Sequence, residues 1–444
     1  MTWRRREVLA LGGSLLGLGG CSGLGWLGAP EEPPLPGERI PVMLLEQGLE
    51  ADPAVTGLPV VLPPPVRNAS WSQLGGNARH AMHHLALGEA LRPAWRASIG
   101  SGSSDTSRLL APPVVAEGRV FTVDTELVVR AFDLASGREQ WSRRPEIIED
   151  VDRLLAGGLA HAQGRLFLTA TNGEIHALDA TNGSALWRRA LKVPIEAPAT
   201  VARGRLFIVT SDNRTLALDA ASGRPLWQHA GFFEQAGILG GAPAAVGGGI
   251  VVAPYSSGEV FALRFADGRP LWSGSVLRLR RTLALGRISD ITAAPVIDDD
   301  RVYVAGNGGE VAAFRLDLGR RIWALDATVR ETPWIAGRFL YLLTSRNELV
   351  CLLRERGAIR WVRRLAELVD PDNPASPHLL WSAPVLAGNR LLLAGSGAEA
   401  VSVSPQSGEI LGRIELPGAV RLQPVVAEGT LLFLTEAGEL LAYR

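Results

Sequence analysis

Short runs rich in apolar residues, each followed by turn-forming residues, recur along the chain from residue 111 onward. The first unit has such runs at 112–115, 119–123 and 129–132, and its last turn ends in Gly137. β-branched and aromatic residues favour strands, and alternation of apolar and polar positions is typical of strands with one buried face. Aspartate caps tight turns, and glycine tolerates the positive φ angles that such turns require. The pattern therefore predicts short β-strands joined by tight turns.

The same unit returns along the chain, in most copies with a tryptophan at its end. The tryptophans are Trp95, Trp141, Trp187, Trp227, Trp272, Trp323 and Trp361. A period of about 40 to 50 residues with strand-forming content is typical of a four-stranded propeller blade. We expect each indole ring to lie on the outer strand and to fill the gap between neighbouring blades. The seventh copy has Gly408 but Leu411 at the position where we expect the tryptophan.

Eight copies can be counted, and the last one stops at Arg444 before its final strand. The segment 91–96 carries Trp95 without a copy in front of it, so we expect this segment to complete the last blade and leave no free edge. The sequence therefore predicts an all-β fold, an eight-bladed β-propeller with four-stranded antiparallel blades. Seven blades is the alternative if the copy with Leu411 is not a blade.

The N-terminus has the features of an export signal. Three arginines at positions 4–6 precede an apolar stretch at 8–20, which is too short to span a bilayer as a helix and ends in small residues before Cys21. This arrangement resembles a lipobox, in which the cysteine is lipidated, and Ser22 resembles the class sorted to the outer membrane. The arginine pair also resembles a twin-arginine signal, so the export route stays open.

These features predict three parts of the chain. Residues 1–20 are expected to be a lipoprotein signal peptide, and residues 21–67 a Pro- and Gly-rich tether that starts at lipidated Cys21. Residues 68–444 are expected to form the propeller. We expect the lipid to be the membrane anchor, since nothing later in the sequence reads as a transmembrane helix.

Charge and composition exclude several classes of function. Lys+Arg and Asp+Glu are 45 each, so no broad basic field exists that would favour nucleic acid. The two cysteines exclude a disulfide framework and a cysteine-based zinc site. His80, His83 and His84 have a spacing that could bind a metal, but with no cysteine or carboxylate beside them they favour a surface loop. The glycines at 247–249 precede no helix and favour a hairpin turn.

The repeat Ala-Leu-Asp-Ala-x-x-Gly-x-x-x-Trp resembles the tryptophan-docking repeat of PQQ-type propellers over residues 71–444. Two families share this repeat: the quinoprotein alcohol dehydrogenases and the BamB family of outer-membrane β-barrel assembly lipoproteins. The lipobox, the tether, the length and the eight copies resemble the BamB family. Residues 287–295 are similar to a BamB loop with the pattern Ser-Asp-x-Asp-Thr-Thr-Pro, whereas the opening at 71–77 occurs in PQQ-like propellers generally.

A PQQ-dependent enzyme needs a cation held by clustered carboxylates, a catalytic aspartate, an aromatic platform and a disulfide between adjacent cysteines. The repeat aspartates Asp133, Asp179 and Asp219 are explained as turn caps, and Cys21 and Cys351 are far apart. Cys351 lies in an apolar run and favours a core thiol. We therefore expect a protein that is not an enzyme, with no catalytic residue, no metal ligand and no cofactor.

Long insertions at 143–155, 231–239, 277–292 and 366–380 are expected to be loops, which often carry function. The BamB resemblance implies that two of them bind the central barrel-assembly protein (BamA-like) through apolar residues, an arginine and an acidic pair. The candidate partner-binding residues are Phe232, Phe233, Ile238, Leu239, Arg281, Arg287, Asp290 and Thr292. Asp290 matches the first acid of the pair, Thr292 departs from the second, and Arg281 or Arg287 could replace the arginine. The apolar residues could instead fold back over the core.

The sequence thus favours a non-enzymatic scaffold lipoprotein of the outer membrane, facing the periplasm. The resemblance implies that it binds the central barrel-assembly protein and aids insertion of outer-membrane proteins, with nascent outer-membrane proteins as a second class of partner. A periplasmic PQQ-dependent dehydrogenase is one alternative. A cell-envelope propeller that binds another protein or a glycan is the other.

Overall fold

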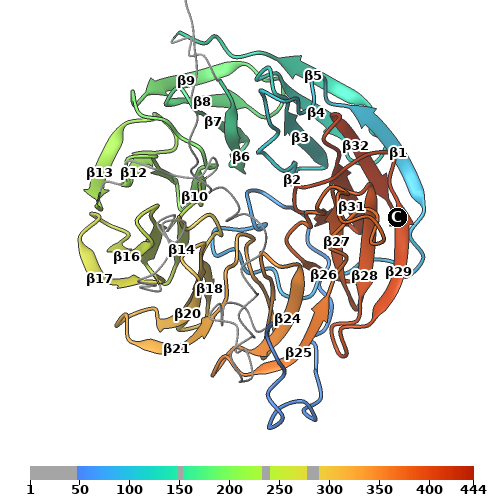
Figure 1. Ribbon diagram of the computed structural model, residues 1–444. Helices are drawn as coiled ribbons and strands as arrows, with labels where there is room; N and C mark the ends of the chain where they lie inside the picture. Colours follow the sequence, from blue (N-terminus) through green and yellow to red (C-terminus); the bar gives the residue numbers. More distant parts are fainter. Residues whose placement is uncertain (1–47, 149–153, 233–240, 278–289) are drawn as a thin grey trace, which may run out of the picture. The chain divides into compact units, whose positions relative to one another are not determined.

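Eight four-stranded antiparallel sheets are arranged as blades around a common centre (Figure 1). The computed structural model describes residues 48–148, 154–232, 241–277 and 290–444, and the unit considered below begins at Leu49. The residues described form strands, turns and loops, and no α-helix occurs among them. None of them therefore builds a helix of the length and apolarity needed to cross a lipid bilayer. The fold prediction, with eight blades and not seven, is confirmed.

The strands follow the chain in blade order. The first four blades contain β2 (Val114–Ala116), β3 (Arg119–Val123), β4 (Val129–Asp133) and β5 (Glu139–Arg143); β6 (Ala156–Ala162), β7 (Arg165–Ala170), β8 (Glu174–Asp179) and β9 (Ala185–Ala190); β10 (Thr200–Ala202), β11 (Arg205–Val209), β12 (Arg214–Asp219) and β13 (Pro225–Ala230); β14 (Ala245–Gly247), β15 (Ile250–Pro254), β16 (Glu259–Arg264) and β17 (Pro270–Ser275). The next three contain β18 (Val296–Asp298), β19 (Arg301–Ala305), β20 (Glu310–Arg315) and β21 (Arg321–Asp326); β22 (Trp334–Ala336), β23 (Phe339–Leu343), β24 (Glu348–Leu353) and β25 (Ile359–Arg364); β26 (Val385–Ala387), β27 (Arg390–Gly395), β28 (Glu399–Val403) and β29 (Ile410–Glu415).

The eighth blade joins the two ends of the propeller. It contains β30 (Val425–Ala427), β31 (Thr430–Leu434) and β32 (Glu439–Tyr443), and its outer strand is β1 (Pro93–Ser98). β1 pairs with β32 in antiparallel register, with Trp95 opposite Ala442. This confirms that the N-terminal strand completes the last blade. The closure matters because an unpaired outer edge on β32 would expose free N–H and C=O groups.

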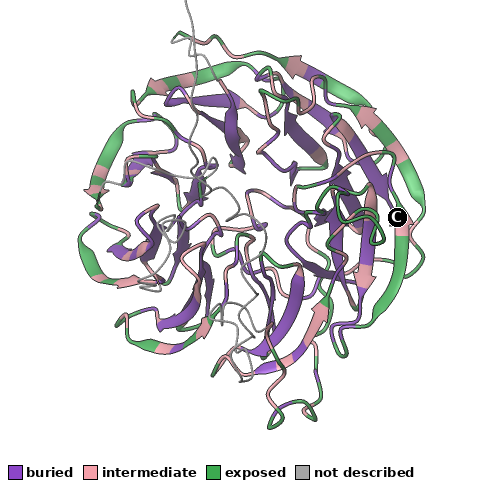
Figure 2. Cartoon of the chain, viewed as in Figure 1, coloured by how far each residue is buried: buried purple, intermediate pink, exposed green. Residues whose placement is uncertain are grey.

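The core lies between adjacent blades, as Figure 2 shows by the buried inner strands and the exposed outer strands. All six residues of β24 are buried, whereas β9 alternates between exposed and half-buried residues. Inner strands have a neighbouring blade on each face, which requires near-continuous apolar sequence. Outer strands are only partly covered, so polar residues alternate there. Phe121 of the first blade and Leu166 of the second belong to one such core cluster.

Each blade-closing tryptophan contacts the next blade. Trp361 lies on β25, and its Nε1 donates a hydrogen bond of 3.1 Å to the carbonyl oxygen of Pro405 in the following blade. Its ring covers the turn glycine Gly408, where an added Cβ would lie 2.7 Å from the ring. The same bond, at 2.7–3.2 Å, joins Trp95 to Leu134, Trp141 to Ala180, Trp187 to Ala220, Trp227 to Phe265, Trp272 to Leu316 and Trp323 to Arg354. Glycine is required at the turn because it has a positive φ and the ring occupies the space of a side chain.

The seventh blade differs from our prediction by one residue. The ladder places Gly412 opposite Ser402, just as Trp361 lies opposite Cys351 in the sixth blade. Gly412, and not Leu411, therefore occupies the tryptophan position. The next blade has no turn between its third and fourth strands, because β32 comes at the C-terminus and β1 comes from the N-terminal side. A tryptophan at this position would find neither a turn glycine nor a turn carbonyl.

Residues 68–85, which we call the clasp, run around the inside of the ring against the first strands of the blades (blue in Figure 1). The clasp bonds the blades in circular order. The contacts are Asn68 with Glu428, Trp71 with Val115, Ser72 with His161, Gln73 with Val201, Ala78 with Val246, Arg79 with Ile297, His83 with Trp334, and Leu85 with Leu386 and Gly388. The inner edge of each first strand has no neighbouring strand, so the clasp satisfies groups that would otherwise stay unpaired.

Two clasp histidines are buried, which corrects the prediction of a surface loop. His80 and His84 are 2% and 1% exposed. The Nδ1 of His80 donates to the carbonyl of Pro295 over 2.7 Å, and the Nδ1 of His84 donates to the carbonyl of Pro63 over 2.7 Å. The Nε2 of His84 accepts from the main-chain N–H of Asn389. Their partners are distant in sequence, so local composition could not indicate burial.

We predict that the clasp makes stability sensitive to acid through His80. Burial lowers the pKa of His80 from 6.5 to about 4. Protonation of His80 is therefore less favourable in the folded state than in the unfolded state. The contribution of His80 to the free energy of unfolding is fully present above pH 6.5 and decreases by about 3 kcal/mol as the pH falls to 4. Urea unfolding at pH 7 and pH 4.5 should show a smaller pH-dependent loss for His80→Gln than for the wild type. His378→Gln, at an exposed position, should behave like the wild type; an equal slope for all three proteins would contradict the prediction.

Residues 52–63, within the stretch expected as a tether, lie along the sixth blade. The main-chain N–H of Asp52 donates to the carbonyl of Ile359 over 2.8 Å, and Arg360 Nε donates to the carbonyl of Leu58 over 2.8 Å. Val55 is fully buried in the same core cluster as Trp361. This segment therefore covers the outer strand β25 of the sixth blade.

Candidate functional site

The connections from the fourth strand of one blade to the first strand of the next define one face of the propeller. Strands alternate in direction, so these connections share that face with the turns between second and third strands. The turns between first and second strands lie on the other face, and the clasp runs beside them. All four insertions that we predicted as loops belong to these connections, and we call this side the loop face.

Three of the eight predicted partner-binding residues are described, and Phe232 alone among these three is exposed. Phe233, Ile238, Leu239, Arg281 and Arg287 lie outside the described residues. The side chain of Phe232 is 71% exposed, directly after β13. Its carbonyl accepts a hydrogen bond of 2.6 Å from Asn213 Nδ2, which holds the start of this loop to the turn between β11 and β12. The structure thus presents a large apolar side chain to solvent on the loop face.

Asp290 and Thr292 have different surroundings. Asp290 is 4% exposed, and its carbonyl accepts a hydrogen bond of 3.0 Å from the N–H of Asn307. Thr292 is half-buried, and its Oγ1 donates to the carbonyl of Arg330 over 3.2 Å. Asp290 therefore belongs to the inner packing of the loop face. The sequence pattern located the segment but could not indicate which of its side chains reach solvent.

The centre of the loop face opens into a channel cavity of about 290 Å³. Residues at or just before the first strands of all eight blades line it, together with Leu74 of the clasp. These residues are Gly157, Pro198, Gly241, Thr292, Thr332, Ala383 and Gln423, together with Pro112 of the first blade. Leu74 belongs to the clasp, so the clasp forms part of the channel wall.

A second cavity of about 420 Å³ lies at the mouth of this channel, over blades one, six, seven and eight. The two cavities share Leu110, Arg330, Glu331, Arg421 and Leu422. The sequence did not indicate these residues as a site, because they come from three different repeats. Their common signal is their position, shortly before a first strand.

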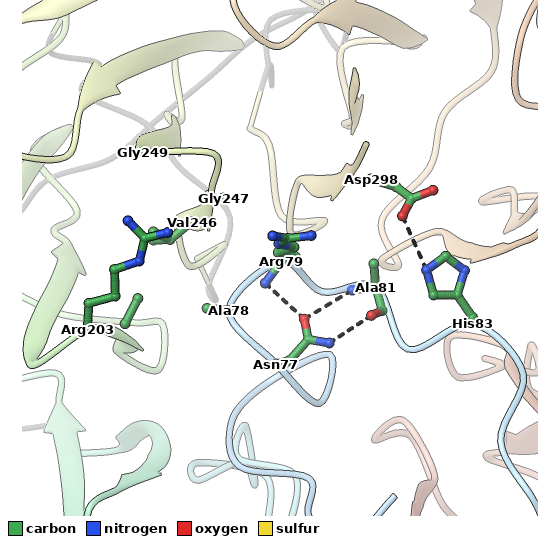
Figure 3. Close-up of a pocket in the computed structure, with 11 residues that line it drawn as sticks. Asn77, Ala78, Arg79, Ala81, His83, Arg203, Val246, Gly247, Gly249 and Asp298 are labelled. Atoms are coloured by element: carbon green, nitrogen blue, oxygen red, sulfur yellow. Dashed lines mark hydrogen bonds and ion pairs between the residues drawn. The ribbon is translucent and has the colours of Figure 1, made fainter. Parts of the chain in front are cut away.

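The opposite face has a pocket between the clasp and the third to fifth blades, about 420 Å³ in volume (Figure 3). Asn77 holds the local turn: its Oδ1 accepts from the N–H of Arg79 over 2.9 Å and its Nδ2 donates to the carbonyl of Ala81 over 2.7 Å. His83 Nε2 lies 3.2 Å from Asp298 Oδ1. Asp298 also forms an ion pair with Arg354, so these polar groups pair with one another and fasten the clasp to β18.

The repeat aspartates and Cys351, which were weighed as candidate residues of a PQQ-dependent enzyme, have structural roles. Asp133 accepts hydrogen bonds from the N–H and the hydroxyl of Ser136, which lowers the pKa of its exposed carboxyl. Burial raises the pKa of the Cys351 thiol well above its ordinary value. Within the described ranges, no group of three or more histidine, cysteine, aspartate or glutamate residues is placed to hold a metal ion. The aspartates act as turn caps.

Comparison with known proteins gives one family. The family described as "Outer membrane protein assembly factor BamB" matches residues 92–152 and 126–363, more than half of the chain. The protein of that name from Shewanella oneidensis is 24% identical over 354 residues, 78% of this chain and 87% of that protein. The one from Escherichia coli is 25% identical over 350 residues, with 78% and 86% covered.

Solved structures share the fold. The crystal structure of BamB from Moraxella catarrhalis has a TM-score of 0.68 at 18% identity and covers 80% of this chain and all of that chain. A quinohemoprotein alcohol dehydrogenase from Comamonas testosteroni has a TM-score of 0.63 at 14% identity, with 85% and 81% covered. Similarity at this level concerns the propeller alone, since one fold can carry unrelated functions.

Proposed function

The chain belongs to the family of outer membrane protein assembly factors BamB, and from this membership we propose that it is a non-enzymatic scaffold for assembly of outer-membrane β-barrel proteins. The observation that carries the proposal is the family match over more than half of the chain. Full-length relatives with this name support it. The turn-capping roles of the repeat aspartates support a non-enzymatic protein.

The partner that we propose is the central barrel-assembly protein, which would bind on the loop face, with nascent outer-membrane proteins as a further class of partner. The exposed side chain of Phe232 supports this surface, since exposed aromatic residues are frequent anchors at protein interfaces. Phe233, Ile238, Leu239, Arg281 and Arg287 complete the proposed contact set. Buried Asp290 would position the loop.

We also propose that the chain is anchored in the outer membrane and faces the periplasm. The N-terminal pattern supports this: a basic stretch, an apolar stretch at 8–20, and Cys21 behind small residues. Residues 1–20 would be removed as the signal peptide, and the lipid on Cys21 would hold the mature protein at the membrane. A Cys21→Ala variant would be found in the soluble periplasmic fraction.

Phe232→Glu is expected to reduce co-purification of the barrel-assembly protein from detergent-solubilised membranes by about fivefold or more. The charge would oppose burial of this position in an apolar interface. The measurement is a pull-down with the tagged protein, quantified against the wild type. Since Phe232 is exposed, the propeller should keep its melting temperature.

Leu318→Glu is the matched control. Leu318 is 68% exposed and lies on a turn between third and fourth strands, on the face opposite the loops. This variant should retain the partner. Equal losses for both variants would contradict the proposed surface. Failure of the wild type to retain the partner, together with dye-linked alcohol oxidation after addition of PQQ and calcium, would overturn the scaffold proposal in favour of a dehydrogenase.

A further inference from the structure

The mouth of the central channel combines positive charge with an apolar wall. Three arginines line the 420 Å³ cavity there: Arg108, Arg330 and Arg421. The apolar wall is formed by Leu109, Leu110, Leu343, Leu380, Trp381 and Leu422. A cavity of this size accommodates a small molecule or the terminal residue of a peptide.

The arginines are not neutralised within the described part of the chain. Arg108 Nη1 and Arg421 Nε lie 3.2 and 3.6 Å from the same oxygen, Oε2 of Glu436, so two guanidinium groups share one carboxylate. Arg330 Nε donates to the amide oxygen of Asn307 over 3.0 Å, a neutral partner. The mouth therefore keeps an excess of positive charge. Guanidinium groups bind carboxylates with paired N–H donors, which gives both strength and orientation.

Glu331 cancels little of this excess below pH 7. Its side chain is half-buried at the junction of the two cavities. Burial raises the pKa of Glu331 to about 7, although a hydrogen bond from the main chain of Ala383 and the positive charge of Arg330 favour the charged form. Near pH 6 most of this carboxyl is protonated and does not cancel the charge of the arginines.

We propose that the channel mouth binds an amphipathic carboxylate, with its anionic group at Arg330 and Arg421 and its apolar group against Leu380, Trp381 and Leu422. Glu436, which Arg108 also contacts, would hold Arg421 in place. Two sources supply this chemistry: a free organic acid with one apolar group, and the C-terminal residue of a polypeptide. The site lies at the centre of the loop face and does not depend on the barrel-assembly role.

The test uses the purified full chain and three probes. A fluorescent peptide that ends in a free phenylalanine carboxylate is compared with the same peptide as a C-terminal amide, by fluorescence anisotropy. N-acetylphenylalanine is added as a competitor. We expect the free carboxylate to bind at least about tenfold more tightly than the amide, since a neutral amide loses the charge-assisted bonds. Equal affinity of the two peptides would overturn the proposal.

Variants assign the site. Arg330→Gln and Arg421→Gln should each weaken binding of the free carboxylate by about fivefold or more. Arg413→Gln is the matched control, because Arg413 is an exposed, ion-paired arginine on the outer strand β29. An equal loss in Arg413→Gln would show general charge attraction and overturn the proposal. If N-acetylphenylalanine displaces the peptide at matched concentration, the natural ligand is identified as a free organic acid. If the peptide binds and N-acetylphenylalanine does not displace it, the ligand is identified as the C-terminal residue of a polypeptide.

The pH dependence gives an independent readout. The charged groups at the two cavities are Arg108, Arg330, Arg421, Glu196, Glu331 and Glu436. Glu331 loses its proton as pH rises through about 7, so the carboxylate should bind about fivefold more weakly at pH 8 than at pH 6. Glu331→Gln should remove most of this dependence. The same dependence in wild type and variant would contradict the placement of the ligand beside Glu331.

Discussion

Replacement of Trp361 by alanine is expected to lower the free energy of unfolding by about 3–5 kcal/mol. The ring is 6% exposed, lies 6.1 Å from the ring of Tyr341, and joins the sixth blade to the seventh through its bond to Pro405. Alanine would leave a cavity between two blades, and the carbonyl of Pro405 would keep only the hydrogen bond of 3.4 Å from the Tyr341 hydroxyl. Equilibrium unfolding in urea measures the loss, and a change below 1 kcal/mol would mean that the ring does not hold the blades together.

Two glycine substitutions separate contact from backbone strain. Gly408→Ala places a Cβ 2.7 Å from the Trp361 ring at φ +74°, whereas Gly429→Ala has φ +70° and no atom within 4 Å. Both substitutions lower the free energy of unfolding by about 1 kcal/mol, because alanine must adopt a positive φ. Only Gly408→Ala also displaces the indole ring of Trp361. Its free energy of unfolding should therefore fall by at least about 2 kcal/mol more than that of Gly429→Ala. The double variant Trp361→Ala/Gly408→Ala should lose less than the sum of the single variants, because the clash is gone.

Trp71→Ala is expected to cost about 3–5 kcal/mol and to loosen the clasp. Trp71 is 1% exposed, and its ring stacks on that of Trp334 with centroids 6.0 Å apart. Its main chain forms two hydrogen bonds with Val115, of 2.8 and 2.9 Å. Since the clasp is bonded to every blade in order, the substitution should also weaken the hydrogen bonds between the clasp and blades that Trp71 does not contact.

Hydrogen exchange of the full chain tests this spread. The amides of His161, Val201 and Val246 donate to the clasp from the second, third and fourth blades, and they should exchange faster in Trp71→Ala. Trp381→Ala is the matched control, because Trp381 is 4% exposed and lies outside the clasp. It should lose similar stability and leave these three amides protected. Faster exchange in both variants would mean a general loss of stability.

The sequence was informative where the physical cause is local and repeated. Apolar runs, capped turns and the spacing from Gly137 to Trp141 occur in every copy with a tryptophan, so the blades and their number followed from the repeat. The strand that closes the ring was predictable because Trp95 has no copy before it. The tryptophan position in the seventh copy was assigned one residue early. Counting four residues from Gly408 leads to Gly412, as the ladder shows.

Features that depend on contacts between distant segments could not be predicted. The clasp has no regular pattern, and the burial of His80 becomes visible only when Pro295 lies beside it. Asp290 matches a sequence motif, yet its exposure depends on how the loop packs near Asn307. The channel mouth assembles Arg108, Arg330 and Arg421 from separate repeats. Each such residue looks like an ordinary solvated arginine in the sequence.

The absence of a tryptophan at Gly412 has a mechanical consequence. In a closed ring, small deviations in the angles between blades add up, and the last junction must accommodate their sum. Seven junctions of the described ring are fixed by an indole ring, and the one after β29 is free of that constraint, so it can take up the accumulated error. We expect this junction to act as the seam of the ring, where a pulling force or a thermal fluctuation first separates two blades. The other seven junctions would then hold the blades together as one open strip.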